Sequence, residues 1–498
     1  MSIDTRPGPP VSQPVSGDRL DRRVLIVAGV VVLGAIMSIL DITVVSVALK
    51  TFQNVFEATP AQVAWTMTGY TLALASVIPM TGWAADRFGT KRLYLLAVAL
   101  FAAGSALCAT APSLELLVTY RVLQGLGGGM LMPLGMTILA RAAGPERVGR
   151  VMAVLGIPML LGPIFGPILG GWLIDTASWH WIFLINVPIG VAALVYAAIV
   201  LPADIVEPSE TFDWVGMLLL SPGLALFLFG VSSIPEQGTV WASRVLVPAS
   251  LGLALIVAFV PWALSGRTAH PLVELRLFKN RIMTVSVIAM SLFAIAFFGA
   301  SLLFPLYFQE VRGETALQAG MLLAPQGIGA MVTMPIAGIL ADRIGPGKIV
   351  LAGITVITVG MAMFTQVGVD TSYAFLLSSL FVMGLGMGAT MMPIMSAALG
   401  SLSHENTARG STLLNITQQV SASIGTALFS VLLTNGFKGI TATTPEGFAA
   451  GMADSFAEVF IVATVLVGCC LIPAAFLPRR RITAADAEAA EPTLMVGH

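Results

Sequence analysis

The sequence has little charge and almost no cysteine. Only 10% of its 498 residues are charged, whereas 57% are hydrophobic. A water-soluble domain has about 25% charged residues, so this chain cannot cover a water-exposed surface. Its three cysteines, Cys108, Cys469 and Cys470, fall in apolar segments, which favours small buried side chains over disulfides or metal ligands. With a mean hydropathy of +0.91, the chain is expected to fold in a lipid bilayer.

The sequence also lacks the motifs of nucleotide-driven and hydrolytic chemistry. It contains no Gly-x4-Gly-Lys loop and no HExxH, CxxC or GxSxG pattern. Its net charge of −1 removes the electrostatic basis for binding a nucleic acid. We therefore expect no enzyme, no cofactor, no metal site, no ATP use and no nucleic-acid partner.

Long apolar runs make up most of the chain. Backbone polar groups find no water inside a bilayer, so each crossing must be a helix, and a crossing needs about 20 apolar residues. The runs predict an all-α polytopic membrane protein with fourteen spans. Their approximate limits are 24–49, 61–82, 93–111, 115–140, 148–174, 181–201, 213–234, 244–264, 282–308, 317–340, 349–367, 373–399, 411–434 and 455–477.

Lysine and arginine are distributed unevenly between the predicted loops. If the N-terminus lies inside, nearly all of them fall on the inner side. This bias predicts that both termini are cytoplasmic. The exceptions on the outer side are Lys50, Arg244, Arg312 and Lys438, and Arg121 lies within a span.

One short charged pattern occurs twice, each time as a turn between two long apolar segments. The copies read Gly82-Trp-Ala-Ala-Asp86-Arg87-Phe-Gly89-Thr-Lys91-Arg92 and Gly338-Ile-Leu-Ala-Asp342-Arg343-Ile-Gly345-Pro-Gly-Lys348. Such a repeat is typical of a duplicated transporter.

The duplication divides the chain into two halves of six helices. The N-terminal half is 24–201 and the C-terminal half is 282–477. Residues 202–281 are linkers that carry two extra spans, 213–234 and 244–264. The ends, 1–23 and 478–498, are predicted to be cytoplasmic, and the first of them disordered.

Three further motifs occupy the first, fourth and fifth predicted spans. They are Leu40-Asp41-Ile-Thr-Val-Val-Ser46, then Arg121-Val-Leu-Gln124-Gly125, and then Gly162, Gly166-Pro167 and Gly170-Gly171. In this order they resemble the fourteen-span drug:proton antiporters of the major facilitator superfamily, over nearly the whole chain. The sequence departs from the family pattern at Ser46, Lys50 and Ala153. The resemblance implies the major facilitator fold and multidrug efflux, driven by the proton gradient, across a bacterial cell membrane.

Asp41 is an acidic residue deep inside the first predicted span. A carboxylate there costs roughly 2.5–3.5 kcal/mol on insertion scales, which favours a functional role. Arg121 lies at a similar depth in the fourth span, on the order of 10 Å below the outer surface. We hypothesise that Asp41 loads and releases a proton and that Arg121 biases its protonation. The alternatives are a structural hydrogen bond for Asp41 and an Arg121 side chain that extends to the membrane surface.

The glycines of the fifth span are spaced for close packing of another helix. Gly162, Gly166 and Gly170 are four residues apart, so they form a smooth ridge on one face of the helix. The resemblance implies that this ridge, together with Pro167 and Gly171, packs against a helix of the C-terminal half and controls the transport cycle. Ordinary tight packing is the alternative.

The repeated turns are candidates for a gate. Asp86 and Asp342 lie near helix ends, where each is expected to cap a neighbouring helix or to pair with Arg87 and Arg343 respectively. The resemblance implies that these contacts close the cytoplasmic side. The alternative is a signal for membrane topology only. The same turns contain Gly82, Gly89, Arg92, Gly338 and Gly345.

The remaining candidates are weaker. Glu310 and Glu458 lie near outer helix ends and fit solvated interface residues better than a second proton site. Crowded methionines near Met391 fit gap filling better than an adaptable binding surface. A substrate cavity is predicted from Ser38, Gln124, Asn415, Gln418 and Gln419, although the last three fit contacts between helices equally well.

These features predict a monomeric, proton-coupled antiporter that exports lipophilic, cationic drugs or toxic compounds by alternating access. Its partners would be the small lipophilic substrate, protons and the lipid bilayer. One alternative is a dedicated exporter of an endogenous lipid, siderophore or metabolite on the same fold. A more distant alternative is a membrane receptor that transports nothing.

Overall fold

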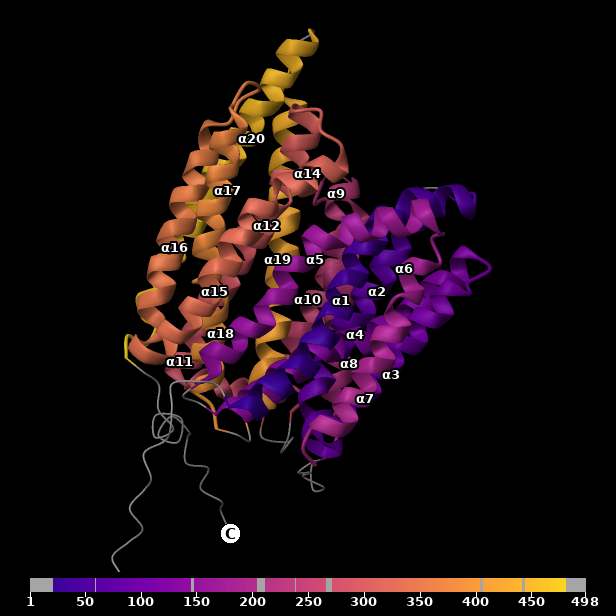
Figure 1. Cartoon of the computed structure of the whole chain (residues 1–498), viewed down its shortest axis with the longest axis vertical. Coiled ribbons are helices and arrows are strands. Elements are labelled where there is room, and N and C mark those ends of the chain that lie inside the picture. Colours follow the sequence, from indigo (N-terminus) through magenta and orange to yellow (C-terminus); the bar gives the residue numbers. More distant parts are fainter. Residues whose placement is uncertain are drawn as a thin grey trace, which may run out of the picture.

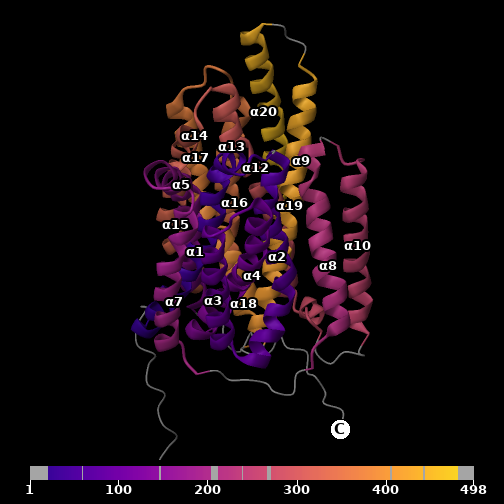
Figure 2. The same ribbon diagram turned by 90° about the vertical axis from the view of Figure 1, so that its right-hand side faces the viewer.

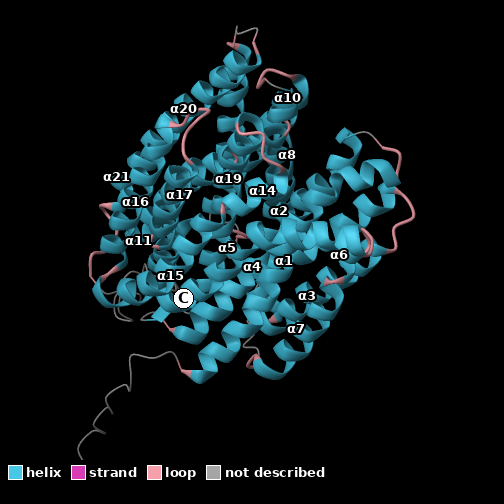
Figure 3. Ribbon diagram, turned by 45° about the horizontal axis from the view of Figure 1, so that its top comes forward, coloured by secondary structure: helices cyan, strands magenta, loops and turns pink. Residues whose placement is uncertain are grey.

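The structure is a computed structural model. It describes residues 21–58, 60–144, 147–203, 211–237, 239–265, 271–403, 406–440 and 444–480. Residues 1–20 and 481–498, which make up most of the two predicted cytoplasmic ends, lie outside the described residues. Within the described residues every regular element is a helix (Figure 3), which confirms the all-α prediction.

Long helices occupy the ranges that the apolar runs predicted. Thirteen helices of the described chain are long and apolar enough to cross a membrane. They correspond to every predicted span except the fifth, and that range is occupied by the 29-residue helix α5, Val148–Thr176. Side chains of several α5 residues, Pro167 among them, lie outside the described residues. The count of fourteen spans therefore stays a prediction.

The N-terminal half contains six long helices. Ser113 begins α4 by accepting a hydrogen bond from the Leu116 amide, which satisfies one of the free amides of the first turn. The helices are α1 Arg22–Val55, α2 Pro60–Phe88, α3 Thr90–Ala109, α4 Leu114–Ala143, α5 and α7 Asn186–Val200, with the short α6 Trp181–Leu184 before α7.

The inserted hairpin consists of two long helices with a short one between them. They are α8 Trp214–Ser232, α9 Ile234–Gln237 and α10 Ser243–Leu264. The helices α8 and α10 pack on each other, and α8 also packs on α2 and on α19, Thr407–Lys438. Figure 2 shows the pair at one side of the molecule.

The C-terminal half repeats the arrangement with more interrupted helices. Its first span is broken by two π-helical turns at 294–298 and 307–311. The helices are α11 Arg281–Phe293, α12 Gly299–Ser301, α13 Leu303–Leu306, α14 Ala316–Leu322, α15 Ala324–Ile344, α16 Pro346–Met363, α17 Tyr373–Gly388, α18 Met391–Gly400, α19, α20 Pro445–Cys469 and α21 Leu471–Ala474.

The two halves lie side by side, with α5 and α19 between them (Figure 1). α2 packs against α19, and α5 packs against α15 and α18. The charged contacts that α2 and α5 make with the C-terminal half, described below, lie at the end of the molecule that carries both repeated turns. We call it the turn end, and it is the end predicted to be cytoplasmic.

Each repeated turn bonds to the C-terminal end of its own half. In the first copy, the Lys91 ammonium donates to the carbonyls of Ala198 (2.7 Å) and Leu201 (2.8 Å), at the end of α7. In the second copy, the Gly347 amide donates to the Pro478 carbonyl (2.9 Å), beyond α21. The duplication therefore extends from the sequence pattern to its packing.

Both turns need glycine at one position. Gly89 has φ 94° and Gly345 has φ 98°, a backbone conformation that side chains with a Cβ adopt only at a cost of about 1–3 kcal/mol. A Cβ on Gly345 would also lie 2.5 Å from the Arg479 carbonyl carbon.

We expect Gly345→Ala to lower the thermal unfolding midpoint of the detergent-solubilised protein. Gly313→Ala is the control, because Gly313 also has a positive φ of 69° but a Cβ there would meet nothing within 4 Å. The Gly345 variant should lose more stability than the control. Equal losses would contradict a role for packing against the C-terminal segment.

Candidate functional site

Asp41 and Arg121 form an ion pair inside the N-terminal half. Arg121 Nη1 on α4 donates to Asp41 Oδ2 on α1, and both residues are 1% exposed. The second carboxylate oxygen of Asp41 accepts hydrogen bonds from Gln124 Nε2 (2.7 Å) and Asn186 Nδ2 (3.2 Å). Three donors thus converge on one carboxylate, and both of its oxygens are hydrogen-bonded.

Arg121 is held from several sides. Its Nε donates to the Thr66 carbonyl (3.0 Å) on α2, and its Nη1 also donates to Gln124 Oε1 (2.8 Å). The guanidinium lies over the Tyr70 ring, 4.2 Å from the ring centre. This burial excludes the alternative in which Arg121 extends to the membrane surface.

Further polar side chains enclose the pair. Asn186 also donates to Ser105 Oγ on α3 (3.2 Å), and Ser105 donates to the Phe183 carbonyl (2.9 Å). On the opposite side, the hydroxyls of Ser38 and Tyr70 are 3.2 Å apart. We call Asp41, Arg121, Gln124, Asn186, Ser105, Ser38 and Tyr70 the acid cluster. It draws on α1, α2, α3, α4 and α7.

Sequence reasoning singled out part of the acid cluster and missed another part. Asn186, Ser105 and Tyr70 were missed, because a single polar residue in an apolar span does not reveal which face it occupies. Ser38 and Gln124 were predicted to line a substrate cavity. In this conformation they are 4% and 0% exposed and bond within the cluster, and their substrate role stays a prediction.

The glycine ridge of α5 lies against α1, and the prediction of a C-terminal-half partner for this ridge is wrong. A Cβ on Gly162 would lie 2.1 Å from Ile39 Cγ2, and a Cβ on Gly166 would lie 1.9 Å from Thr43 Oγ1. Gly170 faces Val44. The contact is therefore inside one half, directly beside Asp41. Glycines mark a close approach in sequence, but they do not identify the helix that approaches.

The opposite end of α5 does contact the C-terminal half. Asp342 of the second turn accepts from the amides of Gly149 (3.0 Å) and Arg150 (3.3 Å), in the first turn of α5. Arg150 Nε lies 3.4 Å from the same carboxylate. Asp342 therefore caps a helix of the other half, as one of the two sequence expectations had it. A Cβ on Gly338, one turn earlier, would lie 2.7 Å from the Gly149 carbonyl oxygen.

Asp86 of the first turn makes the matching contact between halves. It lies 3.2 Å from Arg141 Nη2 on α4 and 3.6 Å from Arg409 Nε on α19. Gly82 faces Thr412 on α19. We call the contacts of Asp86 and Asp342 the latch. The other turn residues lie near it: Arg87 is half-buried, whereas Arg92 and Arg343 are exposed.

Uncharged contacts continue from the latch toward the membrane interior. Thr137 and Ser411 hydroxyls are 2.7 Å apart across the halves, and Asn415 Nδ2 lies 3.1 Å from Met136 Sδ. The Asn415 contact favours packing between helices over a substrate role. Gln418 and Gln419, further along α19, are half-buried.

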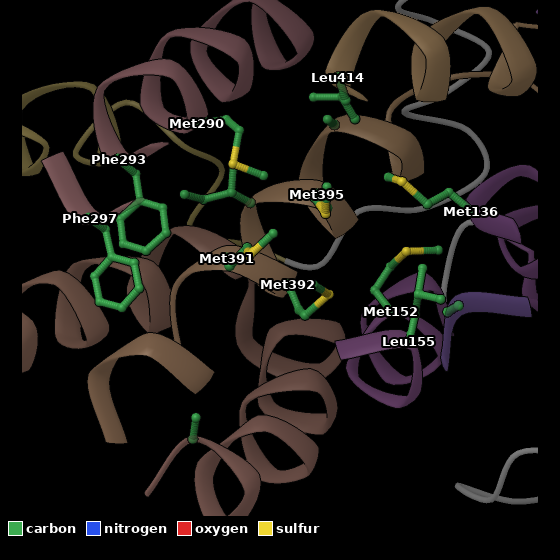
Figure 4. Close-up of a cluster of buried hydrophobic side chains, with 14 of the residues drawn as sticks. Met136, Met152, Leu155, Met290, Phe293, Phe297, Met391, Met392, Met395 and Leu414 are labelled. Carbon is green, nitrogen blue, oxygen red and sulfur yellow. The ribbon is translucent and has the colours of Figure 1, made fainter. Parts of the chain in front are cut away.

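Buried methionines from both halves meet next to these contacts. Figure 4 shows Met136 and Met152 of the N-terminal half facing Met391, Met392 and Met395 of α18. All five are buried, and we call them the methionine seam. Glu310 and Glu458 are exposed residues of the C-terminal half, so they do not belong to the acid cluster.

Two helical halves that meet at a charged latch, with a buried ion pair in one of them, define a polytopic membrane transporter. The sequence profile of the Major Facilitator Superfamily matches residues 31–426, and the chain belongs to this superfamily. It is thus a transporter and not an enzyme, and the fold predicted from the sequence is confirmed.

Curated relatives and solved structures agree with this assignment. The chain is 52% identical to the "Multidrug resistance protein B homolog" of Mycobacterium tuberculosis, over 95% of this chain and 94% of the relative. It is 31% identical to the "Multidrug export protein EmrB" of Escherichia coli, over 81% and 79%. The crystal structure of the human organic anion transporter MFSD10 has a TM-score of 0.62 at 17% identity, covering 90% of this chain and 100% of that chain.

The proton:xylose symporter XylE shares the fold as well, with a TM-score of 0.60 at 14% identity over 94% of this chain and 98% of that one. Together with the bacterial relatives, the family assignment makes this a multi-pass protein of the bacterial plasma membrane. Members of the Major Facilitator Superfamily transport small molecules and generally need no cofactor.

We expect Gly166→Leu to abolish transport while the protein still inserts in the membrane, because the leucine side chain would separate α5 from α1 beside Asp41. Gly320→Leu on α14 is the control, since Gly320 lies outside the fifth-span motif and a Cβ there also meets nothing within 4 Å. Substrate efflux and the amount of folded protein should both be measured. Equal loss of efflux in the two variants would contradict the role of the ridge.

Proposed function

We propose that this transporter exports lipophilic, cationic compounds in exchange for protons, and that Asp41 is the proton site. The observation that carries the proposal is a carboxylate enclosed inside a membrane protein with a cation and two amide donors directed at it. Burying charges is costly, and a membrane protein that needed only stability could use apolar residues at this position. The relatives named for multidrug resistance and export support the substrate class.

The surroundings of Asp41 favour coupling between protonation and shape. Every partner of its carboxylate is a donor, and the proton of a neutral acid would need an acceptor or free space. Asp41 is also shielded from water in this conformation. Uptake of a proton therefore requires Arg121 or the amide groups to move, and we infer that this happens when the halves rearrange.

The helix α5 is the proposed link between the acid cluster and the latch. Near its start it is capped by Asp342 of the other half, and its glycine ridge contacts α1 next to Asp41. Movement of α5 at the latch therefore changes the α1 contact as well. With the turn end on the cytoplasmic side, as the charge bias predicts, the latched structure is the outward-facing state.

We propose that few protons, as few as one, are exchanged per transported molecule. A membrane potential supplies about 2.3 kcal/mol per charge per 100 mV, and 1.36 kcal/mol corresponds to a tenfold ratio. One proton thus supports a gradient of about 50-fold per 100 mV. If one proton exchanges for one monovalent cation, no net charge moves and only the pH gradient remains. We propose that the transporter works as a monomer and without ATP.

A dedicated exporter of one endogenous lipid, siderophore or metabolite is the second candidate, and it would use the same latch and acid cluster. Competition separates the two. Structurally unrelated lipophilic cations should compete with one another for a multidrug exporter, whereas a dedicated exporter should be inhibited only by close analogues of one compound.

We expect Asp41→Asn to remove proton flux. In inside-out vesicles energised to an acidic interior, adding a lipophilic cation should release protons from wild type and not from the variant. The substitution keeps the size of the side chain and removes the group that exchanges a proton.

The control for this experiment is Glu310→Gln, which neutralises an exposed acid outside the acid cluster and should keep the flux. Proton flux that survives in Asp41→Asn would place the coupling site elsewhere. Efflux without any proton flux in wild type would refute antiport itself.

A further inference from the structure

A proton on Asp41 needs an acceptor, and the groups around the carboxylate differ in whether they can provide one. Oδ2 accepts from Arg121 Nη1, and a guanidinium has no acceptor. Oδ1 accepts from the side-chain amides of Gln124 and Asn186. An amide that turns over presents its oxygen in place of its nitrogen. A hydrogen on Oδ1 is therefore accommodated when one of these two amides turns over.

The Gln124 amide is fixed in its present orientation. Its oxygen accepts from Arg121 Nη1 (2.8 Å) and from the Cys108 thiol (3.7 Å). If the amide turned over, its amino group would face the guanidinium, and two donors would meet with no acceptor between them. Gln124 therefore keeps donating to Asp41, whatever the charge of the carboxylate.

The Asn186 amide has a neighbour that suits either orientation. Its Nδ2 donates to Asp41 Oδ1 (3.2 Å) and also to Ser105 Oγ (3.2 Å). A hydroxyl can donate as well as accept, so Ser105 can bond the Asn186 oxygen after the amide has turned over. Asn186 is therefore the group that can supply an acceptor for a proton on Asp41.

Ser105 connects this amide to a short helix. Its hydroxyl has a single hydrogen, which it donates to the Phe183 carbonyl (2.9 Å). Phe183 belongs to α6, which is separated from α7 at Ile185. Pro188 lacks the N–H that would bond the Leu184 carbonyl and continue the helix. The hydrogen bond from Ser105 thus holds a helical turn that α7 does not hold by itself.

The Phe183 ring belongs to a group of buried aromatic side chains, Phe52, Trp179 and Phe183, which we call the aromatic plug. Phe183 stacks on Phe52 (6.3 Å between ring centres), and Trp179 meets Phe52 edge-on (5.5 Å). Arg121 Cζ is 5.9 Å from the Phe183 ring centre. α1 runs away from the turn end (Figure 1), so Phe52 lies about 16 Å beyond Asp41 in that direction. The plug therefore lies between the acid cluster and the outer end, opposite the turn end.

We propose that Asn186, Ser105 and the Phe183 carbonyl form a hydrogen-bond switch, through which a proton on Asp41 loosens the aromatic plug. The proton binds Asp41 Oδ1, and the Asn186 amide turns over to accept its hydrogen bond. The Ser105 hydrogen then turns to the same Asn186 oxygen and leaves the Phe183 carbonyl. Loss of the proton restores the present arrangement. Asn186 and Ser105 are positioning residues, and the switch rests on the proposed role of Asp41 as the proton site.

The test measures hydrogen exchange of the α6 amides by mass spectrometry, on the full chain in lipid nanodiscs at one pH. Asp41→Asn stands in for the protonated acid, because its side chain is neutral and carries a donor. It should raise α6 exchange about fivefold, the effect of losing one hydrogen bond. Ser105→Ala removes the same bond, so it should raise exchange by the same factor, with or without Asp41→Asn.

A third variant gives the opposite sign. Asn186→Leu keeps the approximate size of the side chain but breaks the link between Asp41 and Ser105. α6 exchange should stay low in this variant and should no longer respond to Asp41→Asn, whereas a general loss of packing would raise it. If Asn186→Leu does not insert, the combination of Asp41→Asn with Ser105→Ala carries the test alone.

Ser379→Ala is the matched control. Ser379 is as buried as Ser105, at 0% exposure, and donates to the Phe375 carbonyl (2.7 Å) within its own helix α17. Its loss should leave α6 exchange unchanged.

The outcomes separate the switch from the proposed function. Additive effects of Asp41→Asn and Ser105→Ala would overturn the switch, because the two changes would then act independently. If Asp41→Asn abolishes proton flux but leaves α6 exchange unchanged, the proton site stands and only the switch is wrong. Proton flux that survives Asp41→Asn would overturn the proposed function and the switch together.

Discussion

The burial of two opposite charges, Asp41 and Arg121, each 1% exposed, is the constraint on which the N-terminal half depends. Neither charge can be left without partners at that depth, so four helices contribute groups that satisfy them: Gln124 from α4, Asn186 from α7, Tyr70 and the Thr66 carbonyl from α2, and Ser105 from α3 behind Asn186. The helices are thereby fixed relative to one another by a polar centre and not by apolar packing alone. A change in the charge of Asp41 would therefore alter contacts that join all of these helices. A proton-driven transporter needs such a connection between charge and helix position.

The helix α5 links this centre to the latch. Small residues allow α5 to approach α1 at Gly162 and Gly166, and the free amides at its first turn allow it to bind Asp342 across the halves. The helix α5 is thus close-packed at one end and electrostatically held at the other. Glu274, in the segment between the inserted hairpin and α11, adds a further contact at the latch, since its Oε2 lies 3.6 Å from Arg409 Nη1.

The sequence predicted the architecture well because its causes are local. Apolar runs and the repeated charged turn sufficed for the helices and the two halves, and depth alone put Asp41 level with Arg121, which the structure pairs. The partners that sequence could not supply are those chosen by tertiary packing. Gly166 was assigned the wrong neighbour, and Asn186 and Glu274 were not singled out. A glycine permits a close approach and an amide can donate a hydrogen bond. Which neighbour makes the contact is decided by the arrangement of the helices.

The methionine seam has a consequence of its own. Met136, Met152, Met391, Met392 and Met395 close the contact between the halves through unbranched thioethers, which repack more easily than branched side chains (Figure 4). Oxidation converts a thioether to a polar, chiral sulfoxide. In the proposed alternating movement, each opening of the halves would expose sulfur atoms that the closed form buries, so the methionine seam would also be sensitive to oxidants. A transporter that cycles quickly is, in this respect, chemically more vulnerable than the same molecule at rest.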